Sequence, residues 1–212
     1  PKAYLHFLES SDCPILPMGY ESAELAKISI NCCLVASVSV ANTLAEICER
    51  IGADWSEIVP ALKLDGRIGP YSYLNPGLGI AGGNLERDLE TVLRFAEANK
   101  TDGGVVAAWV HNSKHRKNWA HRVLCDIVFP TNPTPKIGVL GLAYKENTHS
   151  IKNSPSLALL AQLASHHVTV FDPIVTATVA PNAHGADSAI SAIKGADVVL
   201  IMTPWPEFRN LK

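Results

Sequence analysis

The sequence predicts an α/β protein in which an all-helical region precedes a small Rossmann-like domain with a parallel sheet. Two observations carry this prediction. Between Tyr20 and Gly52 there is no proline or glycine, and apolar residues recur three and four positions apart, which is typical of one long helix. After a proline-rich segment at 130–135, strand-like apolar runs alternate with helical segments, which favours parallel strands joined by crossover helices.

The composition is that of a soluble globular protein, with 47% hydrophobic and 18% charged residues. A formal net charge of -2 provides no basic surface for nucleic acid, and no run of about 18 apolar residues or signal-peptide core is present. We therefore expect a cytoplasmic protein that contacts neither nucleic acid nor membrane. The cysteines include no Cys-x-x-Cys pair and the histidines no His-Glu-x-x-His pattern, so reduced structural thiols and no metal site are expected.

Most of the first 129 residues are predicted to be helical. Residues 1–20 include two prolines and are predicted to form a strand-like connector. The long helix is predicted over 21–51, with Ser22 as its N-cap and Gly52 as its C-terminal stop. At about 1.5 Å per residue it would extend for about 45 Å, more than the core of a small domain needs. The surplus apolar length predicts a homodimer packed through this helix. Further helices are expected over 54–63, 84–99 and 104–128.

The segment at 130–135 is a linker by composition, and the sheet domain is predicted over 136–212. Its glycines at Gly138 and Gly141 lack the full Gly-x-Gly-x-x-Gly spacing, so they are a weak nucleotide signal alone. Ligands nevertheless bind at the carboxyl ends of parallel strands, where Lys145, Thr148 and Lys152 could meet a phosphate. Strands are expected over 136–142, 167–172 and 197–202, and helices over 154–165 and 186–193.

The loop from Leu74 to Asp88 contains four glycines and runs into a helix. Glycines remove side-chain bulk and permit unusual dihedrals, so backbone can approach a ligand there, and the first N–H groups of the helix can point at an anion. The alternative is a plain helix entry with Asn84 as N-cap.

Five motifs follow one another along the chain: Ser22-Ala23-Glu24-Leu25-Ala26-Lys27 with Asn31, Asp65-Gly66-Arg67-Ile68-Gly69 with Leu74-Asn75-Pro76-Gly77, the loop from Gly82 to Asp88, Gly141 to Thr148 with Ser154-Pro155, and Trp205-Pro206-Glu207-Phe208. Together they resemble the UDP-glucose/GDP-mannose dehydrogenase family, NAD-dependent enzymes that oxidise the C6 alcohol of a sugar nucleotide. The resemblance covers nearly the whole chain. It implies a dimerising central domain over 21–129 and a truncated nucleotide-sugar-binding domain over 136–212. It also implies that residues 1–20 lead from an NAD-binding domain outside this sequence.

The main departure from the family pattern is Asn84, which stands where the family places its catalytic cysteine. The family thiolate traps the aldehyde product of the first oxidation, so that a second hydride transfer can give a thioester. An amide has no comparable nucleophilicity. Cys32 and Cys33 lie elsewhere on the long helix and are poor substitutes.

The resemblance assigns catalytic roles to three further positions. Lys27 and Asn31 lie four apart and share a helix face, which suits a pair that holds an alkoxide or a water near the sugar C6. Asp88 matches the family aspartate that helps to activate water. The alternatives are a solvated lysine with a surface amide, and an aspartate that complements the helix dipole.

Other positions match substrate or cofactor contacts. The resemblance implies that Arg67 reaches the partner's substrate across the dimer, and that Lys152 contacts the NAD pyrophosphate. The resemblance also implies substrate-binding roles for residues before the helix at 84–99 and after the first predicted strand, namely Tyr73, Asn75, Gly82, Tyr144 and Lys145.

Two functions therefore remain open. In the first, the chain supplies the substrate site and dimer interface of an NAD-dependent nucleotide-sugar 6-dehydrogenase. In the second, it belongs to a non-catalytic nucleotide-sugar-binding or scaffold protein that has lost the thiol chemistry.

Overall fold

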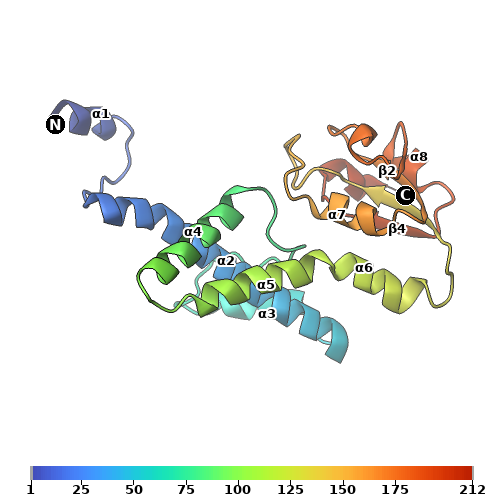
Figure 1. Ribbon diagram of the computed structural model, residues 1–212, viewed down its shortest axis with the longest axis horizontal. Helices are drawn as coiled ribbons and strands as arrows, with labels where there is room; N and C mark the ends of the chain where they lie inside the picture. Colours follow the sequence, from blue (N-terminus) through green and yellow to red (C-terminus); the bar gives the residue numbers. More distant parts are fainter. Residues whose placement is uncertain (1, 212) are drawn as a thin grey trace.

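The computed structural model describes residues 2–211 and consists of a helical part and a sheet domain (Figure 1). The helical part contains α1 (Lys2–Glu9), α2 (Tyr20–Ile51), α3 (Trp55–Leu64), α4 (Asn84–Ala98), α5 (Gly104–Lys117) and α6 (Trp119–Val123), the last continuing into a π-helical turn (Leu124–Val128). The sheet domain contains β1 (Lys136–Leu140), α7 (Pro155–Gln162), β2 (His167–Phe171), β3 (His184–Gly185), α8 (Ala189–Ile193) and β4 (Val198–Ile201), with 3-10 turns at Ala177–Val179 and Pro206–Asn210. The predicted fold class is confirmed.

The first residues do not form the predicted strand-like connector. Lys2–Glu9 is a helix, because it is rich in residues with good helix propensity and the two prolines come only afterwards, in an irregular segment. The predicted N-cap Ser22 is also wrong, since α2 begins at Tyr20 behind an extended Gly19. The predicted end is confirmed: Gly52 is left-handed at φ 77, and its N–H donates to the Cys48 carbonyl.

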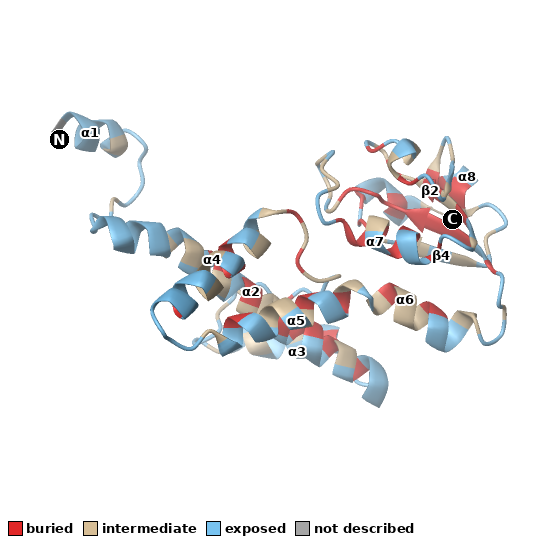
Figure 2. Cartoon of the chain, in the orientation of Figure 1, coloured by how far each residue is buried: buried red, intermediate tan, exposed pale blue. Residues whose placement is uncertain are grey.

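One face of α2 forms the core of the helical part (Figure 2). It packs against α4 and α5 around a cluster of Val35, Ile80, Leu89 and Val106. Nearer its C-terminal end, Ala41, Ala45 and Cys48 join Trp55 and Leu74 in a second cluster, where Trp55 Nε1 donates to the Leu74 carbonyl at 2.9 Å. Small residues on α2 allow the α3 region to approach closely at this point.

The other face of α2 stays uncovered in a single chain. Its exposed apolar residues are Ile30, Leu34, Val40, Leu44, Ile47 and Ile51. By length and composition alone α2 is the one helix among residues 2–211 that could cross a membrane, with a mean hydropathy of 1.6 over its best 18 residues. A core helix of a soluble protein passes the same test, and α2 carries one packed face and one uncovered face.

The single helix predicted over 104–128 is wrong, because the structure interrupts it at Asn118. On one side of this break α5 packs against α2 and α4. On the other side Ala120 and Leu124 enter the core of the sheet domain. The two segments contribute to different cores, a division that periodicity does not reveal.

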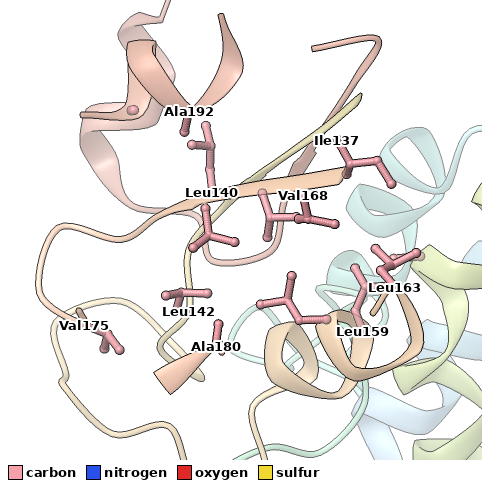
Figure 3. Packing of buried hydrophobic residues seen from close by; sticks show 14 of the residues in the cluster. Ile137, Leu140, Leu142, Leu159, Leu163, Val168, Val175, Ala180 and Ala192 are labelled. Carbon is pink, nitrogen blue, oxygen red and sulfur yellow. The ribbon is translucent and has the colours of Figure 1, made fainter. Parts of the chain in front are cut away.

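The sheet is fully parallel, with strand order β3-β2-β1-β4. Val139 of β1 lies in register between Val170 of β2 and Leu200 of β4. Figure 3 shows the core between this sheet and its helices, where Leu140, Val168 and Leu159 are buried together. The helix predicted over 186–193 begins later, at Ala189, because the Ser188 hydroxyl caps it by accepting from Ser191 N.

Candidate functional site

The Gly-rich loop before α4 is held by two helices of the helical part. Gly77 N donates to Asn42 Oδ1 at 2.7 Å, and Arg116 Nε donates to the Gly77 carbonyl at 2.9 Å. Two residues further on, Gly79 has a φ of 78. A Cβ added to Gly79 would lie 2.5 Å from the Ser113 carbonyl oxygen, so no larger residue fits there. Ile80 N donates to Ser113 Oγ at 2.8 Å. Helices α2 and α5 therefore fix the path of the loop before it reaches α4.

Arg116 is itself fixed by a charged network. Its side chain is only 7% exposed, lies 4.9 Å from the Trp119 ring centroid and pairs with Glu46 at 3.4 Å. Burial alone would raise the pKa of Glu46, but hydrogen bonds from His115 and Arg122 outweigh it and hold that pKa below its usual value. The network keeps a cation aimed at the loop backbone.

Three predicted residues form a hydrogen-bonded line beside the loop. Lys27 Nζ donates to Asn31 Oδ1 at 3.2 Å, and Asn31 Nδ2 donates to Asp88 Oδ2 at 2.6 Å. An ammonium can only donate and an ionised carboxylate can only accept, so the two neighbours fix the orientation of the amide. Asn31 and Asp88 are buried. Lys27 is exposed, so the alternative of a solvated lysine fits that residue, whereas the buried Asn31 is not a surface amide.

The sheet domain meets the loop at Gly82. Gly82 N donates to the Lys152 carbonyl at 3.0 Å, and Asn153 Nδ2 donates to the Gly82 carbonyl at 2.7 Å. Gly82 has a φ of 80, and its added Cβ would lie 3.2 Å from the Tyr144 ring. The neighbouring Lys145 ammonium lies 5.7 Å from that ring's centroid. Tyr144 therefore packs directly on loop backbone, which requires glycine at this position.

Asp172 is a residue of this region that the sequence predictions missed. Its Oδ2 accepts from Leu142 N at 2.7 Å, Ala143 N at 3.0 Å and Trp205 Nε1 at 3.1 Å. Its Oδ1 accepts from the backbone N–H groups of residues 174 and 175. Burial alone would raise the pKa of Asp172, but these backbone donors outweigh it and lower the pKa. An aspartate directly after the second strand was the available signal, and its carboxylate holds the segment that leads to Tyr144.

Two cavities meet at Asn84. The larger, of about 770 Å³, lies between the helical part and the sheet domain, and the smaller, of about 320 Å³, lies between α2 and α4. Both are lined by Lys27, Asn31 and Asn84, and the smaller one also by Asp88. The larger one is further lined by four predicted substrate residues and the loop glycine, namely Tyr73, Asn75, Gly82, Tyr144 and Lys145.

Two predicted residues lie outside these linings. Arg67 pairs with Asp65, with Nη2 2.6 Å from Oδ2, on an exposed turn after α3. Hydrogen bonding to Asp65 raises the pKa of Arg67 and lowers that of Asp65. The Lys152 side chain passes over Gly83, and a Cβ added to Gly83 would lie 2.5 Å from Lys152 Nζ. The structure therefore brings Lys152 to the edge of the loop, and it does not bring Arg67 to the cavities of its own chain.

Neither cavity is lined by a cysteine among residues 2–211. The thiol nearest in sequence to Asn31 is Cys32, whose pKa is raised by burial and by the neighbouring Cys33 and Asp88. A raised pKa leaves less of the nucleophilic thiolate form at Cys32. Asn84 itself is the first residue of α4, with Gly83 at the N-cap position, so the alternative of Asn84 as N-cap is wrong.

Two domain descriptions of one family match the chain. The UDP-glucose/GDP-mannose dehydrogenase family, central domain, matches residues 21–114, and the UDP binding domain of that family matches residues 138–212. Fold and matches agree on a helical part followed by a parallel-sheet domain. The chain belongs to the UDP-glucose/GDP-mannose dehydrogenase family.

The similar proteins include UDP-glucose dehydrogenases. UDP-glucose 6-dehydrogenase TuaD of Bacillus subtilis is 31% identical over 94% of this chain and 44% of its own length. UDP-glucose 6-dehydrogenase AglM of Haloferax volcanii is 32% identical over 93% of the chain and 46% of its own length. A solved UDP-glucose dehydrogenase from Pyrobaculum islandicum is 25% identical, with a TM-score of 0.89 over 100% of this chain and 51% of that one. The chain thus spans about half the length of the relatives that it matches.

Proposed function

We propose that the chain is the substrate-binding half of an NAD-dependent nucleotide-sugar dehydrogenase that oxidises the C6 alcohol of the sugar. The observation that carries this proposal is the hydrogen-bonded line of Lys27, Asn31 and Asp88. Lys27 and Asn31 of this line border the larger cavity, which Tyr144 and Lys145 of the sheet domain also line. At about 770 Å³ the cavity lies within the roughly 300–1,000 Å³ range of small-molecule sites.

The line supports charge stabilisation at the sugar C6. Asn31 uses its carbonyl oxygen on Lys27 and one amide hydrogen on Asp88, which leaves its second amide hydrogen and two of the three Lys27 hydrogens for the cavity. These donors would hold a developing alkoxide or a water without reorganising. Asp88 anchors the amide, and its ionised form provides a base beside Asn31.

Substrate contacts are proposed from the remaining walls. Tyr73 and Asn75 would pack on the sugar nucleotide from one side, and Tyr144 with Lys145 from the other, where the ammonium suits a phosphate. Gly82 lets backbone approach the ligand. Arg67, exposed beside Asp65, is proposed to reach the substrate of a partner subunit. The dimer itself is proposed to form through the uncovered apolar face of α2.

NAD is the proposed hydride acceptor, bound mainly by residues outside this chain. The contact proposed within the chain is Lys152. Its ammonium lies over Gly83 and makes no ion pair among the described residues, so it fits a pyrophosphate oxygen.

Asn84 is compatible with the first oxidation, of alcohol to aldehyde, but not with the thiol-dependent second oxidation. Hydride transfer from an alcohol needs a base, the acceptor and orientation, all of which are compatible with an amide at position 84. Capture of the aldehyde as a thiohemiacetal needs a thiolate, and no cysteine of the described chain lines the cavities. We therefore expect the aldehyde as the released product, or slow acid formation through the aldehyde hydrate.

Calorimetry of this chain with UDP-glucose and GDP-mannose, together with NADH absorbance, tests the proposal. We expect weak nucleotide-sugar binding without NAD reduction by the chain alone, and reduction by the full-length protein. Asn84 at the position of the family cysteine favours a second candidate, a nucleotide-sugar-binding protein without catalysis. Binding without NAD reduction by the full-length protein would select it, and turnover by the isolated chain would contradict both.

A further inference from the structure

Glu86, in the first turn of α4, contacts both parts of the molecule. Its Oε1 lies 2.6 Å from Lys117 Nζ, and its Oε2 accepts a hydrogen bond from Asn153 Nδ2. Lys117 is the last residue of α5, directly before the break at Asn118. Asn153 belongs to the loop that precedes α7 of the sheet domain. One carboxylate therefore bridges the end of the helical part and the start of a sheet-domain helix.

The same asparagine is bonded to the Gly-rich loop. Asn153 Nδ2 also donates to the Gly82 carbonyl at 2.7 Å, while Gly82 N donates to the Lys152 carbonyl at 3.0 Å. The two hydrogens of the amide are thus both used, one on Gly82 and one on Glu86. Asn153 adopts a φ of 53, a left-handed conformation that asparagine tolerates better than most residues. Its backbone is shaped to present the amide to the loop.

The two parts are otherwise joined through α6 and through the contacts of Gly82 and Gly83 with Tyr144 and Lys152. Helix α5 contributes apolar residues to the core of the helical part, whereas Ala120 of α6 contributes to the core of the sheet domain, so the helix break at Asn118 lies between the two cores. Glu86 connects the two sides of this break at the edge of the larger cavity. Without it, the Tyr144 wall and the Lys27 wall would be held together mainly by α6 and the loop backbone.

We propose that Glu86, Lys117 and Asn153 form a latch that holds the sheet domain against the Gly-rich loop and so sets the width of the larger cavity. These are positioning residues, because none of the three lines the cavity. That the cavity holds a nucleotide sugar rests on the proposed function; the latch itself rests on the contacts described above.

Amide hydrogen exchange in the full-length protein tests the latch without a ligand. The variants are Glu86→Ala and Asn153→Gly, the second of which keeps the left-handed backbone and removes only the side-chain amide. A matched control is Glu90→Ala, which removes an exposed carboxylate from the same helix that makes no side-chain hydrogen bond or ion pair among residues 2–211. A hydrogen bond to a charged group is worth about 1.5 kcal/mol or more, so we expect about tenfold faster exchange at Gly82 in each latch variant.

Three features of the result decide the proposal. The double variant should exchange no faster at Gly82 than either single variant, because both remove the same latch. Val139 and Val170 in the sheet core should keep their exchange rates. Unchanged exchange at Gly82, or an equal rise at Gly82 and in the sheet core, would overturn the latch and leave Glu86 as an ordinary stabilising residue.

Binding provides a second readout. In calorimetry with UDP-glucose, latch variants should bind about tenfold more weakly than the wild type and the Glu90→Ala control, since a cavity of variable width lowers the binding-competent fraction. Equal affinity in all variants would contradict the positioning role. If the wild type binds no nucleotide sugar, the proposed function fails, and the exchange experiment still decides the latch.

Discussion

Asp172→Asn should destabilise the sheet domain strongly at neutral pH, because the aspartate accepts five hydrogen bonds through two oxygens. Oδ2 receives three donors and Oδ1 receives two. Asparagine has only one side-chain oxygen, so its NH₂ group would face at least two N–H donors that can no longer be satisfied. At about 1–3 kcal/mol for each buried unpaired donor, the free energy of unfolding should fall by about 2–6 kcal/mol.

The sign of the pH dependence follows from the lowered pKa of Asp172. A carboxyl with a lower pKa in the folded state contributes stability that is fully present above its unfolded pKa, near 3.8. That contribution is lost as the pH falls through the lower folded value. The difference in stability between wild type and Asp172→Asn should therefore be constant near neutral pH and shrink below about pH 4.

Denaturant unfolding followed by circular dichroism measures this difference from pH 7 downward. The control is Asp187→Asn, which changes an exposed aspartate of the same domain that makes no side-chain hydrogen bond or ion pair in the described part of the chain. It should change the free energy of unfolding by less than about 0.5 kcal/mol. The reasoning is refuted if Asp172→Asn unfolds like the control, or if its destabilisation does not diminish below pH 4.

Three further predictions concern the site, the fold and the assembly. Asp88→Asn should lower the kcat of NAD reduction by the full-length protein by about 10²-fold or more, because Asn31 loses its anionic anchor; an unchanged kcat would exclude Asp88 from the reaction. Gly141→Ala should lower the free energy of unfolding by more than about 3 kcal/mol, because the new Cβ would lie 2.4 Å from Thr203 Cβ. The control Gly195→Ala, at a position with positive φ but open space, should lower it by only about 1 kcal/mol. Equal decreases in denaturant unfolding would show that the clash at position 141 is relieved. Leu44→Arg should convert the proposed dimer to a monomer in light scattering, because it places a charge on the uncovered face of α2; a dimer that persists would place the interface elsewhere.

The product of the full-length protein tests the consequence of Asn84. Mass spectrometry of protein quenched during turnover should find no sugar adduct on any cysteine, and aldehyde should accumulate ahead of acid. Asn84→Cys should increase acid formation only if the sugar carbon already lies beside Lys27 and Asn31. An adduct on a native cysteine would show that the nucleophile lies outside the loop.

The sequence by itself determined the helices and strands whose apolar residues repeat at a helical or strand spacing. The unbroken apolar repeat from Tyr20 to Gly52 dictates one long helix, and the glycine at its end adopts the left-handed turn that stops it. The alternating apolar runs after residue 135 predicted β1, β2 and β4 close to their observed bounds, but not the two-residue β3. Spacing also placed Lys27 and Asn31 on one helix face, where they do hydrogen-bond.

Only the tertiary structure decided which of these residues meet. The break at Asn118 arises because the segments on its two sides pack in different cores, which no local pattern encodes. Asp88 reaches Asn31 from 57 residues away, and Asn153 reaches Gly82 from 71 residues away. The first contact depends on the packing of α4 against α2, and the second on the packing of the sheet domain against the Gly-rich loop. Hydrogen bonds between distant segments form only where folding brings donor and acceptor within about 3 Å. The sequence therefore predicted Lys27, Asn31 and Asp88 as candidate site residues, and only the packing of α4 against α2 brought Asp88 to Asn31.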